Sequence, residues 1–408
     1  MIQTSEKPIP AITELSDTIR ITSVTTQVVN AGLRNWIFVR VETNVDGLIG
    51  WGEATLEWKT RAVVGAIDDL APLLIGQDPR NIEGIYRRFI KQGFWRLGVI
   101  GMTAVSGIEM ALWDIFGKSV GLPVWRLLGG QVRDRVKVYT HLGLGQQDAV
   151  YGSFGPAEVV ERALEVIEKG YKAIKVVFIP YVHMTADGQS LRQVDNSMKA
   201  LREAVGDDIE IMVDFHGRCG SWGAALQFAK VLQPYRPMFI EEPLPPQDIK
   251  GLIKLSQHCP VPLATGERLI GREEFEVLVA ERAIQIAQPD ICHTGGLLET
   301  KKIASMCEMA GIGMAPHNPL GPIAGAAALH FAISTPNFTI QEEMSGAVPW
   351  YSEVVRGPIK LVDGYWSIPQ APGLGVEVDE AIADAHPYQQ EPFITQSALI
   401  DDGTVVDW

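Results

Sequence analysis

Short apolar runs that end in polar residues recur at a regular spacing through the second half of the chain. The run at residues 209–216, IEIMVDFH, ends in Asp214 and His216, which are two apart and share a face if the run is a β-strand. Later runs end at successive spacings of 27, 26, 23, 27 and 25 residues, in Glu241, Glu267, Asp290, His317 and Glu342. Each spacing has room for one strand and one crossover helix. The pattern predicts a (β/α) barrel with polar residues at the carboxyl ends of its strands.

The barrel is expected to occupy residues 134–365, after the turn at Gly129 and Gly130. Its first two strands are predicted at residues 136–141, VKVYTH, and 173–178, AIKVVF, and the other six should begin near residues 209, 237, 261, 283, 311 and 337. Helical patterns lie between the strands, but no clean amphipathic helix follows the eighth. The predicted fold is therefore α/β, a (β/α)7β variant of the TIM barrel.

The first part of the chain has a different pattern, which predicts a separate α+β capping domain over residues 1–133. Residues from about 20 to 54 alternate as a three-stranded meander, followed by helical patterns at about 60–75, 81–92 and 101–119. The segment 366–408 contains PGLGVEVD, a short strand that is expected to return to the capping domain.

Composition narrows the classes of function and location. With 408 residues, 46% of them hydrophobic, the chain can bury two cores, and its net charge of −14 argues against a nucleic-acid-binding surface. The first 17 residues are polar and lack a signal-peptide core, and no run reaches about 18 uninterrupted apolar residues, so we expect no membrane span and a cytoplasmic protein. The cysteines form no CxxC pair and are expected to be reduced thiols: Cys219, Cys259, Cys292 and Cys307.

Three acids end successive strands and form a candidate metal site. Neighbouring parallel strands lie about 4.8 Å apart, so Asp214, Glu241 and Glu267 can converge on one point. Their like charges would repel unless a cation neutralised them, and all-oxygen ligation favours Mg²⁺ first and Mn²⁺ second. The alternative is three acids solvated separately at the barrel rim.

The histidines at the strand ends suggest acid–base chemistry. Asp290 can orient His317 and support its protonated form, which is typical of a poised base, although a structural hydrogen-bonded histidine would show the same pattern. His216, beside Asp214, is a candidate general acid if protonated. His293 is interpreted as a loop-packing residue.

Two further charged residues lie on predicted barrel strands. Lys175 can hold a substrate carboxylate or lower the pKa of a neighbour, and a Schiff base is a weaker alternative because it needs no triad of carboxylates. Glu342 can hydrogen-bond a substrate carboxylate if it is protonated. Glu343 is the competing assignment, since the strand register is uncertain by one residue.

Ordered motifs along nearly the whole chain resemble the acid-sugar dehydratases of the enolase superfamily, in its mandelate racemase-like subgroup, and most of all the galactonate dehydratase type. The motifs are GWGEA, LIGQDP, IEMALWDIFGK, PVWRLLGG, VDFHGR, YRPMFIEEP, ATGER, QPDICHTGG, APHNPLGPIA and PGLGVEVD. The resemblance implies Mg²⁺ bound by the three acids, His317 paired with Asp290 as the base, His216 as the acid, and Glu342 as the family glutamate of the eighth strand. It also implies an even-numbered homo-oligomer.

The chain departs from the wider superfamily at the second strand. Many members carry Lys-x-Lys there, whereas this sequence has Lys175-Val176-Val177, which weakens racemisation but leaves elimination by one base and one acid intact. The expected reaction is dehydration of a sugar acid to a 2-keto-3-deoxy acid through an ene-diolate. A cycloisomerase, an epimerase and a non-catalytic sugar-acid binding protein remain alternatives. The family arrangement suggests capping-domain loops for recognition of distal hydroxyls: Arg34, Asn35, Trp36, Glu57 and Trp58.

Overall fold

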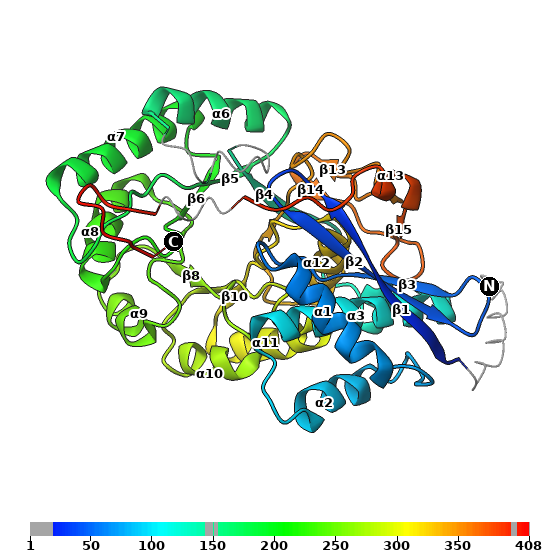
Figure 1. Ribbon diagram of the computed structural model, residues 1–408. Helices are drawn as coiled ribbons and strands as arrows, with labels where there is room; N and C mark the ends of the chain where they lie inside the picture. The colour runs from blue at the N-terminus through cyan, green and yellow to red at the C-terminus, as the bar shows by residue number, and fades with distance from the viewer. Residues whose placement is uncertain (1–18, 143–149, 151–153, 393–397, 408) are drawn as a thin grey trace, which may run out of the picture.

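The fold is described from a computed structural model, in which residues 19–142, 150, 154–392 and 398–407 are described. The polar N-terminal segment considered above lies outside these residues. A central barrel and a smaller domain beside it make up the molecule (Figure 1).

Eight short parallel strands form the barrel, as the sequence predicts. They are β4 (Val136–His141), β5 (Ala173–Val176), β6 (Glu210–Asp214), β7 (Phe239–Glu241), β8 (Leu263–Thr265), β9 (Ile286–Ala287), β10 (Gly313–Met314) and β11 (Gln341–Glu342). Neighbours in sequence pair in order from β4 to β10, and β11 pairs with β4. Met314 forms a parallel bridge with Phe338, just before β11, and its carbonyl accepts a hydrogen bond from the Thr339 amide at 2.7 Å. These contacts close the circle.

Within the described residues, seven helices lie between the strands of the barrel. They are α6 (Pro156–Glu168), α7 (Gly188–Val205), α8 (Trp222–Leu232) with the 3₁₀ turn η2 (Gln233–Tyr235), α9 (Ile249–Ser256), α10 (Arg272–Ala280), α11 (Gly296–Ala310) and α12 (Pro322–Ser334). In the described part of the chain, the next helix after β11 is the short α13 (Glu380–Asp384), far along the tail. The (β/α)7β prediction is confirmed.

The capping domain pairs a three-stranded antiparallel sheet with a long helix. Its strands are β1 (Ile21–Asn30), β2 (Asn35–Thr43) and β3 (Ile49–Glu53). Its helices are α1 (Thr60–Leu70), η1 (Ala71–Leu73), α2 (Ile82–Gln92), α3 (Gly98–Val120) and α4 (Val124–Leu127). A Cβ atom added to Gly50 or Gly52 of β3 would lie 2.1 or 1.9 Å from a carbonyl oxygen of α3, so the GWGEA motif is needed for this close approach. Helix α3 is long and apolar enough to cross a membrane, but 83% of its most apolar stretch is buried in the protein core.

The C-terminal segment packs against both domains. It contains β12 (Val355–Arg356), β13 (Leu361–Val362), β14 (Tyr365–Trp366) and β15 (Glu377–Val378). The PGLGVEVD strand, β15, pairs with β12 rather than with the capping sheet, while Gly373 bridges Pro123 of the capping domain. The chain then runs along β1, where the Asn30 amide donates to the His386 carbonyl at 2.8 Å.

Three buried carboxylates of the capping domain bind backbone amides elsewhere in the fold. Glu53 accepts from the first turn of α12, at Gly321 (2.7 Å) and Ala324 (2.9 Å). Glu109 accepts from Leu297 (2.8 Å) and Leu298 (2.9 Å) at the start of α11. Asp114 accepts from Trp51 (3.0 Å) and Leu374 (2.8 Å). Glu53 and Glu109 thus satisfy amides that a helix leaves unpaired at its N-terminus, and they fix the capping domain on the barrel.

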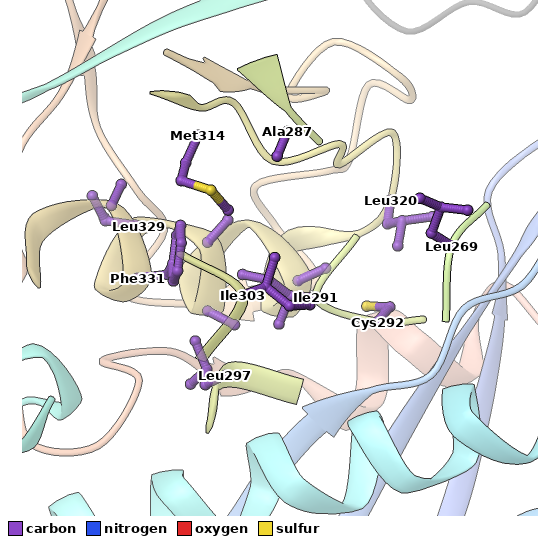
Figure 2. Packing of buried hydrophobic residues seen from close by; sticks show 14 of the residues in the cluster. Leu269, Ala287, Ile291, Cys292, Leu297, Ile303, Met314, Leu320, Leu329 and Phe331 are labelled. Carbon is purple, nitrogen blue, oxygen red and sulfur yellow. The ribbon is translucent and has the colours of Figure 1, made fainter. Parts of the chain in front are cut away.

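The barrel loops beneath the capping domain share a continuous apolar core. Figure 2 shows Ile291 and Cys292 of the β9–α11 segment in the same buried cluster as Ile303 of α11 and Leu320 of the β10–α12 loop. This packing anchors the residues immediately after Asp290.

Candidate active site

A cavity of about 390 Å³ lies at the carboxyl ends of the barrel strands and is lined by both domains. The capping domain contributes Arg34, Leu56, Glu57, Trp58, Lys59 and Val99. The barrel contributes His141, Val150, Lys175, Asp214, His216, Glu267, Arg268, His293, His317, Pro319 and Met344. Most of the charged groups predicted at strand ends therefore meet in one space.

The two-residue alternation of side chains along a β-strand explains why polar groups from six strands point into the barrel. A small apolar cluster inside the barrel consists of Tyr139, Ala173, Met212, Phe239, Ala264, Ala315 and Ile340. Because alternate strand residues share a face, the residue two positions later points to the same interior, one layer nearer the mouth. In strand order, six of those positions hold His141, Lys175, Asp214, Glu241, His317 and Glu342. The period also decides between Glu342 and Glu343. Glu342 faces the barrel interior, whereas Glu343 turns away to Tyr171 and Ser345.

The acids proposed as metal ligands lie side by side. Asp214 and Glu241 are register partners on β6 and β7, and Glu267 follows β8 by two residues. Burial raises the pKa of Glu241 well above its ordinary value, and the Asp214, Glu342 and Glu267 carboxylates act in the same direction. Burial likewise raises the pKa of Glu267, to about 7. The cost of ionising these groups indicates a cluster that gains from added positive charge.

Lys175 supplies part of that charge from the protein itself. Its Nζ lies 2.7 Å from Glu241, 2.8 Å from Glu342 and 3.6 Å from Asp214. Burial opposes its protonation, but the Glu241 and Glu342 carboxylates outweigh burial and hold the pKa of Lys175 well above its ordinary value. A permanently charged ammonium is a poor nucleophile, so the geometry argues against the Schiff-base alternative.

The carboxylate oxygens of Asp214, Glu241 and Glu267 are the ligand type that a hard divalent cation prefers. The side chains as they lie do not form a complete coordination shell. No group of three His, Cys, Asp or Glu side chains among the described residues could hold a metal ion as placed. The Lys175 ammonium lies against Glu241 Oε1, at 2.7 Å. Yet Glu241 Oε2 is buried without a hydrogen-bond partner, and an oxygen so placed costs free energy until a cation or donor reaches it. Asp214, Glu241 and Glu267 are thus the residues that would hold the metal.

The predicted pair of Asp290 and His317 is present. His317 Nδ1 lies 2.8 Å from Asp290 Oδ2, and its Nε2 is 3.5 Å from Glu267 Oε2 in the cavity. Burial opposes a charge on the ring, but the Glu267, Glu342 and Asp290 carboxylates outweigh it and raise the pKa of His317 to about 10. Any ligand that neutralises Glu267 weakens this hold on the proton, which a base must lose before it can act.

His216 also lines the cavity, in the turn after β6. Its backbone has a φ of 55°, and its amide donates to Asp214 Oδ1 at 2.8 Å. Burial lowers the pKa of His216 to about 3, against the opposing pull of Asp214. The ring is therefore neutral at pH 7, and a role as general acid requires that substrate binding bring a proton to it.

Glu342 lies away from the cavity surface, in contact with two residues that line it. Its side chain is fully buried behind the cavity wall, with Oε1 2.6 Å from His141 Nε2 and 2.8 Å from Lys175 Nζ. Burial favours protonation, but Lys175 and His317 outweigh it and keep the pKa of Glu342 well below its ordinary value. An ionised carboxylate cannot donate a hydrogen bond to a substrate carboxylate. Glu342 instead orients His141 and Lys175, which do reach the cavity.

Comparison with known proteins identifies the family. The profile "Mandelate racemase / muconate lactonizing enzyme, N-terminal domain" matches residues 12–129, and "Enolase C-terminal domain-like" matches residues 158–382. The chain belongs to the enolase superfamily. The predicted resemblance is confirmed.

Curated and solved relatives of this superfamily match over most of their length. D-galactonate dehydratases from Klebsiella pneumoniae (strain 342) and Cronobacter sakazakii are each 36% identical over 381 residues, which is 91% of this chain and 96% of theirs. A mandelate racemase/muconate lactonizing enzyme-like protein from Roseovarius sp. TM1035 superposes with a TM-score of 0.84 at 33% identity, covering 91% of this chain and 96% of that one. An enolase superfamily member from Salmonella Typhimurium gives 0.84 at 29% identity, covering 90% and 98%. The curated relatives support the prediction of an acid-sugar dehydratase.

Two of the capping-loop residues suggested by the superfamily arrangement do not reach the cavity. Asn35 is fully buried and donates to the Gln389 carbonyl at 2.9 Å, and Trp36 is fully buried against Trp350 and Tyr351. Both residues begin β2 and are covered by later parts of the chain, so neither side chain reaches the cavity. Arg34 and Trp58 do line the cavity, where Arg34 pairs with Glu57 at 2.9 Å.

Sequence reasoning missed three cavity residues in this superfamily member. His141 ends the first barrel strand and would have been found by the same strand-end signal as the others. His293 was interpreted as loop packing, yet it lines the cavity with Nε2 3.7 Å from Asp290 Oδ2. Arg268 pairs with buried Glu242, at 2.8 Å through Nε and 2.6 Å through Nη2. No sequence pattern indicates that pairing across 26 residues.

Proposed function

We propose that the protein is a Mg²⁺-dependent dehydratase that converts an aldonate of the D-galactonate kind to a 2-keto-3-deoxy sugar acid. The observation that carries the proposal is the meeting of the Asp290–His317 pair with Asp214, Glu241 and Glu267 around one cavity. The names of the curated relatives support the sugar-acid class. Mn²⁺ is the expected substitute metal.

His317 begins the reaction as the base. Its Nε2 faces the cavity and removes the proton from the substrate carbon next to the carboxylate, while Asp290 stabilises the imidazolium through Nδ1. The electron pair of the broken C–H bond spreads into the substrate carboxylate. Lys175, which is charged and lies at the cavity floor, is placed to bind that carboxylate. A divalent cation held by the three acids supplies further positive charge for the carboxylate.

His216 is the candidate acid for the second step. β6 and the strand before His317 lie on different sides of the barrel, so the two rings approach the substrate from different directions. Once substrate binding has brought a proton to the His216 ring, that proton leaves with the hydroxyl of the next carbon as water, a C=C bond replaces the C–O bond, and the enol tautomerises to the ketone. One base and one acid suffice, which agrees with Val177 in place of a second strand lysine.

The site favours elimination over racemisation and epimerisation, which proceed through the same ene-diolate intermediate. Racemisation and epimerisation need proton exchange on both faces, and Val177 lies outside the set of residues that line this cavity. We also propose, from the acidic charge and the superfamily, a cytoplasmic homo-oligomer that acts on a small sugar acid, with no nucleic-acid or membrane partner.

A screen of aldonates and aldarates tests the proposal. The protein is incubated with Mg²⁺ and each acid in D₂O, and proton NMR follows the products. The expected result is a 2-keto-3-deoxy acid from D-galactonate or a stereoisomer. A 2-epimer or a lactone as the main product would favour epimerase or cycloisomerase chemistry. Binding of an acid without any turnover would instead indicate a binding protein.

A further inference from the structure

Helix α3 of the capping domain carries a polar stripe on an otherwise apolar surface. Thr103, Ser106 and Glu109 are spaced three residues apart, so they lie along one side of the helix. All three are buried. A polar side chain in a buried apolar helix is costly unless it is hydrogen-bonded, so each of these three residues requires a partner.

Each of the three has a partner in the segment that carries the catalytic aspartate, although Ser106 also donates to the Met102 carbonyl and Glu109 also accepts from Trp113 within α3. Thr103 Oγ1 lies 3.1 Å from His293 Nδ1, and Ser106 Oγ accepts the Gly295 amide at 3.0 Å. Glu109 accepts the amides that open α11, as described above. The stripe therefore holds the β9–α11 segment at three successive points, beginning three residues after Asp290.

The contact at His293 differs in kind from the other two. Ser106 and Glu109 bind backbone, whereas Thr103 binds a side chain that reaches the catalytic pair. His293 Nε2 lies 3.7 Å from Asp290 Oδ2, the same oxygen that His317 Nδ1 approaches at 2.8 Å. Asp290 Oδ1 is held separately by the Cys292 amide at 2.7 Å. The carboxylate is thus bound through one oxygen by a backbone amide, while its other oxygen lies within hydrogen-bond distance of His317 and within 3.7 Å of the His293 ring.

Charge complementarity decides where the His293 ring proton sits. With the proton on Nδ1, the Nε2 lone pair would face the Asp290 carboxylate, which is repulsive. With the proton on Nε2, the ring presents a donor to Asp290, and Nδ1 accepts the hydroxyl hydrogen of Thr103. Thr103 then donates to His293, and His293 and His317 each direct a ring N–H at the Asp290 carboxylate.

We propose that Thr103 and His293 are positioning residues, by which the capping domain orients Asp290 toward the catalytic base His317. The inference rests on the proposed function, in which His317 removes the substrate proton. Loss of the Thr103 hydroxyl frees the His293 ring to rotate or to change tautomer. Asp290 Oδ2 then loses the His293 N–H that faces it at 3.7 Å, and the carboxylate holds the His317 ring less firmly in place.

Three substitutions separate this role from simple packing. Thr103→Val keeps the shape and removes the hydroxyl, and Thr103→Ser keeps the hydroxyl. Ser106→Ala is the matched control, because it removes one hydrogen bond between the same helix and the same segment without touching His293. We expect Thr103→Val to lower kcat by about tenfold or more, since small misplacements of catalytic groups cost up to about 10²-fold, with KM within threefold of the parent. Thr103→Ser and Ser106→Ala should both stay within threefold of the parent kcat.

A second measurement needs no substrate and therefore stands apart from the proposed function. Nitrogen NMR of histidine-labelled protein, with His293 assigned by its loss in His293→Gln, should show a protonated Nε2 and a bare Nδ1. In Thr103→Val the Nδ1 signal should shift. A protonated Nδ1 in the parent, a kcat for Thr103→Val within twofold of the parent, or an equal loss in Ser106→Ala would each overturn the inference. If no sugar acid is turned over by the parent protein, the proposed function fails while the NMR result still decides whether the contact exists.

Discussion

Two sets of buried carboxylates in this protein differ in how their oxygens are satisfied. Glu53 and Glu109, at the domain interface, each accept two backbone amides at the start of a barrel helix. Glu241 and Glu267, at the barrel mouth, face other carboxylates, and Glu241 Oε2 has no hydrogen-bond partner among the described residues. Burial raises the pKa in both sets, but backbone amides bind both oxygens of each acid in the first set, whereas in the second Lys175 binds one oxygen of Glu241. The hydrogen-bonded carboxylates at the interface stabilise the contact between the domains, whereas the carboxylates at the barrel mouth are suited to binding a cation.

The largest effect should follow removal of the metal. We expect chelation to abolish turnover and Mg²⁺ to restore it. Without the metal, no divalent cation neutralises the carboxylates at the barrel mouth or attracts the substrate carboxylate. Unfolding by urea in the presence of chelator should show that the metal-free protein is still folded. Full turnover by the metal-free protein would contradict the assignment of Asp214, Glu241 and Glu267.

Replacement of the base should come next. His317→Asn keeps a polar side chain of similar size but removes proton transfer, so kcat should fall by about 10²–10⁴-fold. Exchange of the substrate hydrogen next to the carboxylate should fall by the same factor, as measured by proton NMR in D₂O. A rate within a few-fold of the parent would exclude His317 as the base.

The comparison itself can be tested by matched truncations. Glu109→Ala leaves the Leu297 and Leu298 amides and the Trp113 indole without an acceptor in the core. Glu241→Ala removes the same atoms and takes one carboxylate from Lys175, but Lys175 keeps Glu342 at 2.8 Å and the repulsion with Asp214 and Glu267 is relieved. Each lost buried acceptor costs about 1–3 kcal/mol, so Glu109→Ala should lower the free energy of unfolding by about 3 kcal/mol more than Glu241→Ala does. Urea titrations of both variants without metal measure the difference. Equal losses would show that the two sets do not differ as described.

The smallest effect concerns pH. Burial raises the pKa of Glu53 to about 7 from an ordinary 4.5, although hydrogen bonds from Ala324, Thr55 and Gly321 oppose it. The folded state therefore holds the proton more tightly than the unfolded chain, and this stabilisation is lost as pH rises from 4.5 through 7. Between pH 5 and 8 the parent should lose on the order of 3 kcal/mol relative to Glu53→Gln, which does not titrate. Urea unfolding at the two pH values checks this, and a pH-independent difference would contradict it.

Much of the site follows from the sequence, because the period of a strand is two and the period of a βα unit is nearly constant. These two rules place Asp214, Glu241, His317 and Glu342 at the barrel mouth, and applied to the first strand they also place His141. Glu267 and Asp290 lie on turns beyond their strands. Their proximity to the cavity was predicted, but their partners depend on the loop conformation.

Contacts between domains could not be predicted in the same way. The polar residues of α3 look like minor interruptions of an apolar helix until the β9–α11 segment is seen against them. Asn35 and Trp36 adjoin the cavity residue Arg34 in sequence, yet both are buried at the start of β2 against segments that follow the barrel strands in the chain. The partners of the α3 residues and the burial of Asn35 and Trp36 both depend on tertiary packing, which no local sequence pattern predicts.

The most direct test of the account is whether proton removal and loss of hydroxyl can be separated. His216→Asn, incubated with Mg²⁺ and the active sugar acid in D₂O, should exchange the substrate hydrogen next to the carboxylate while forming little 2-keto product, because His317 is intact and the leaving hydroxyl receives no proton. The exchanged substrate should keep its configuration, since Val177 provides no base on the other face. Normal dehydration by His216→Asn, or epimerised substrate, would contradict a mechanism of one base and one acid.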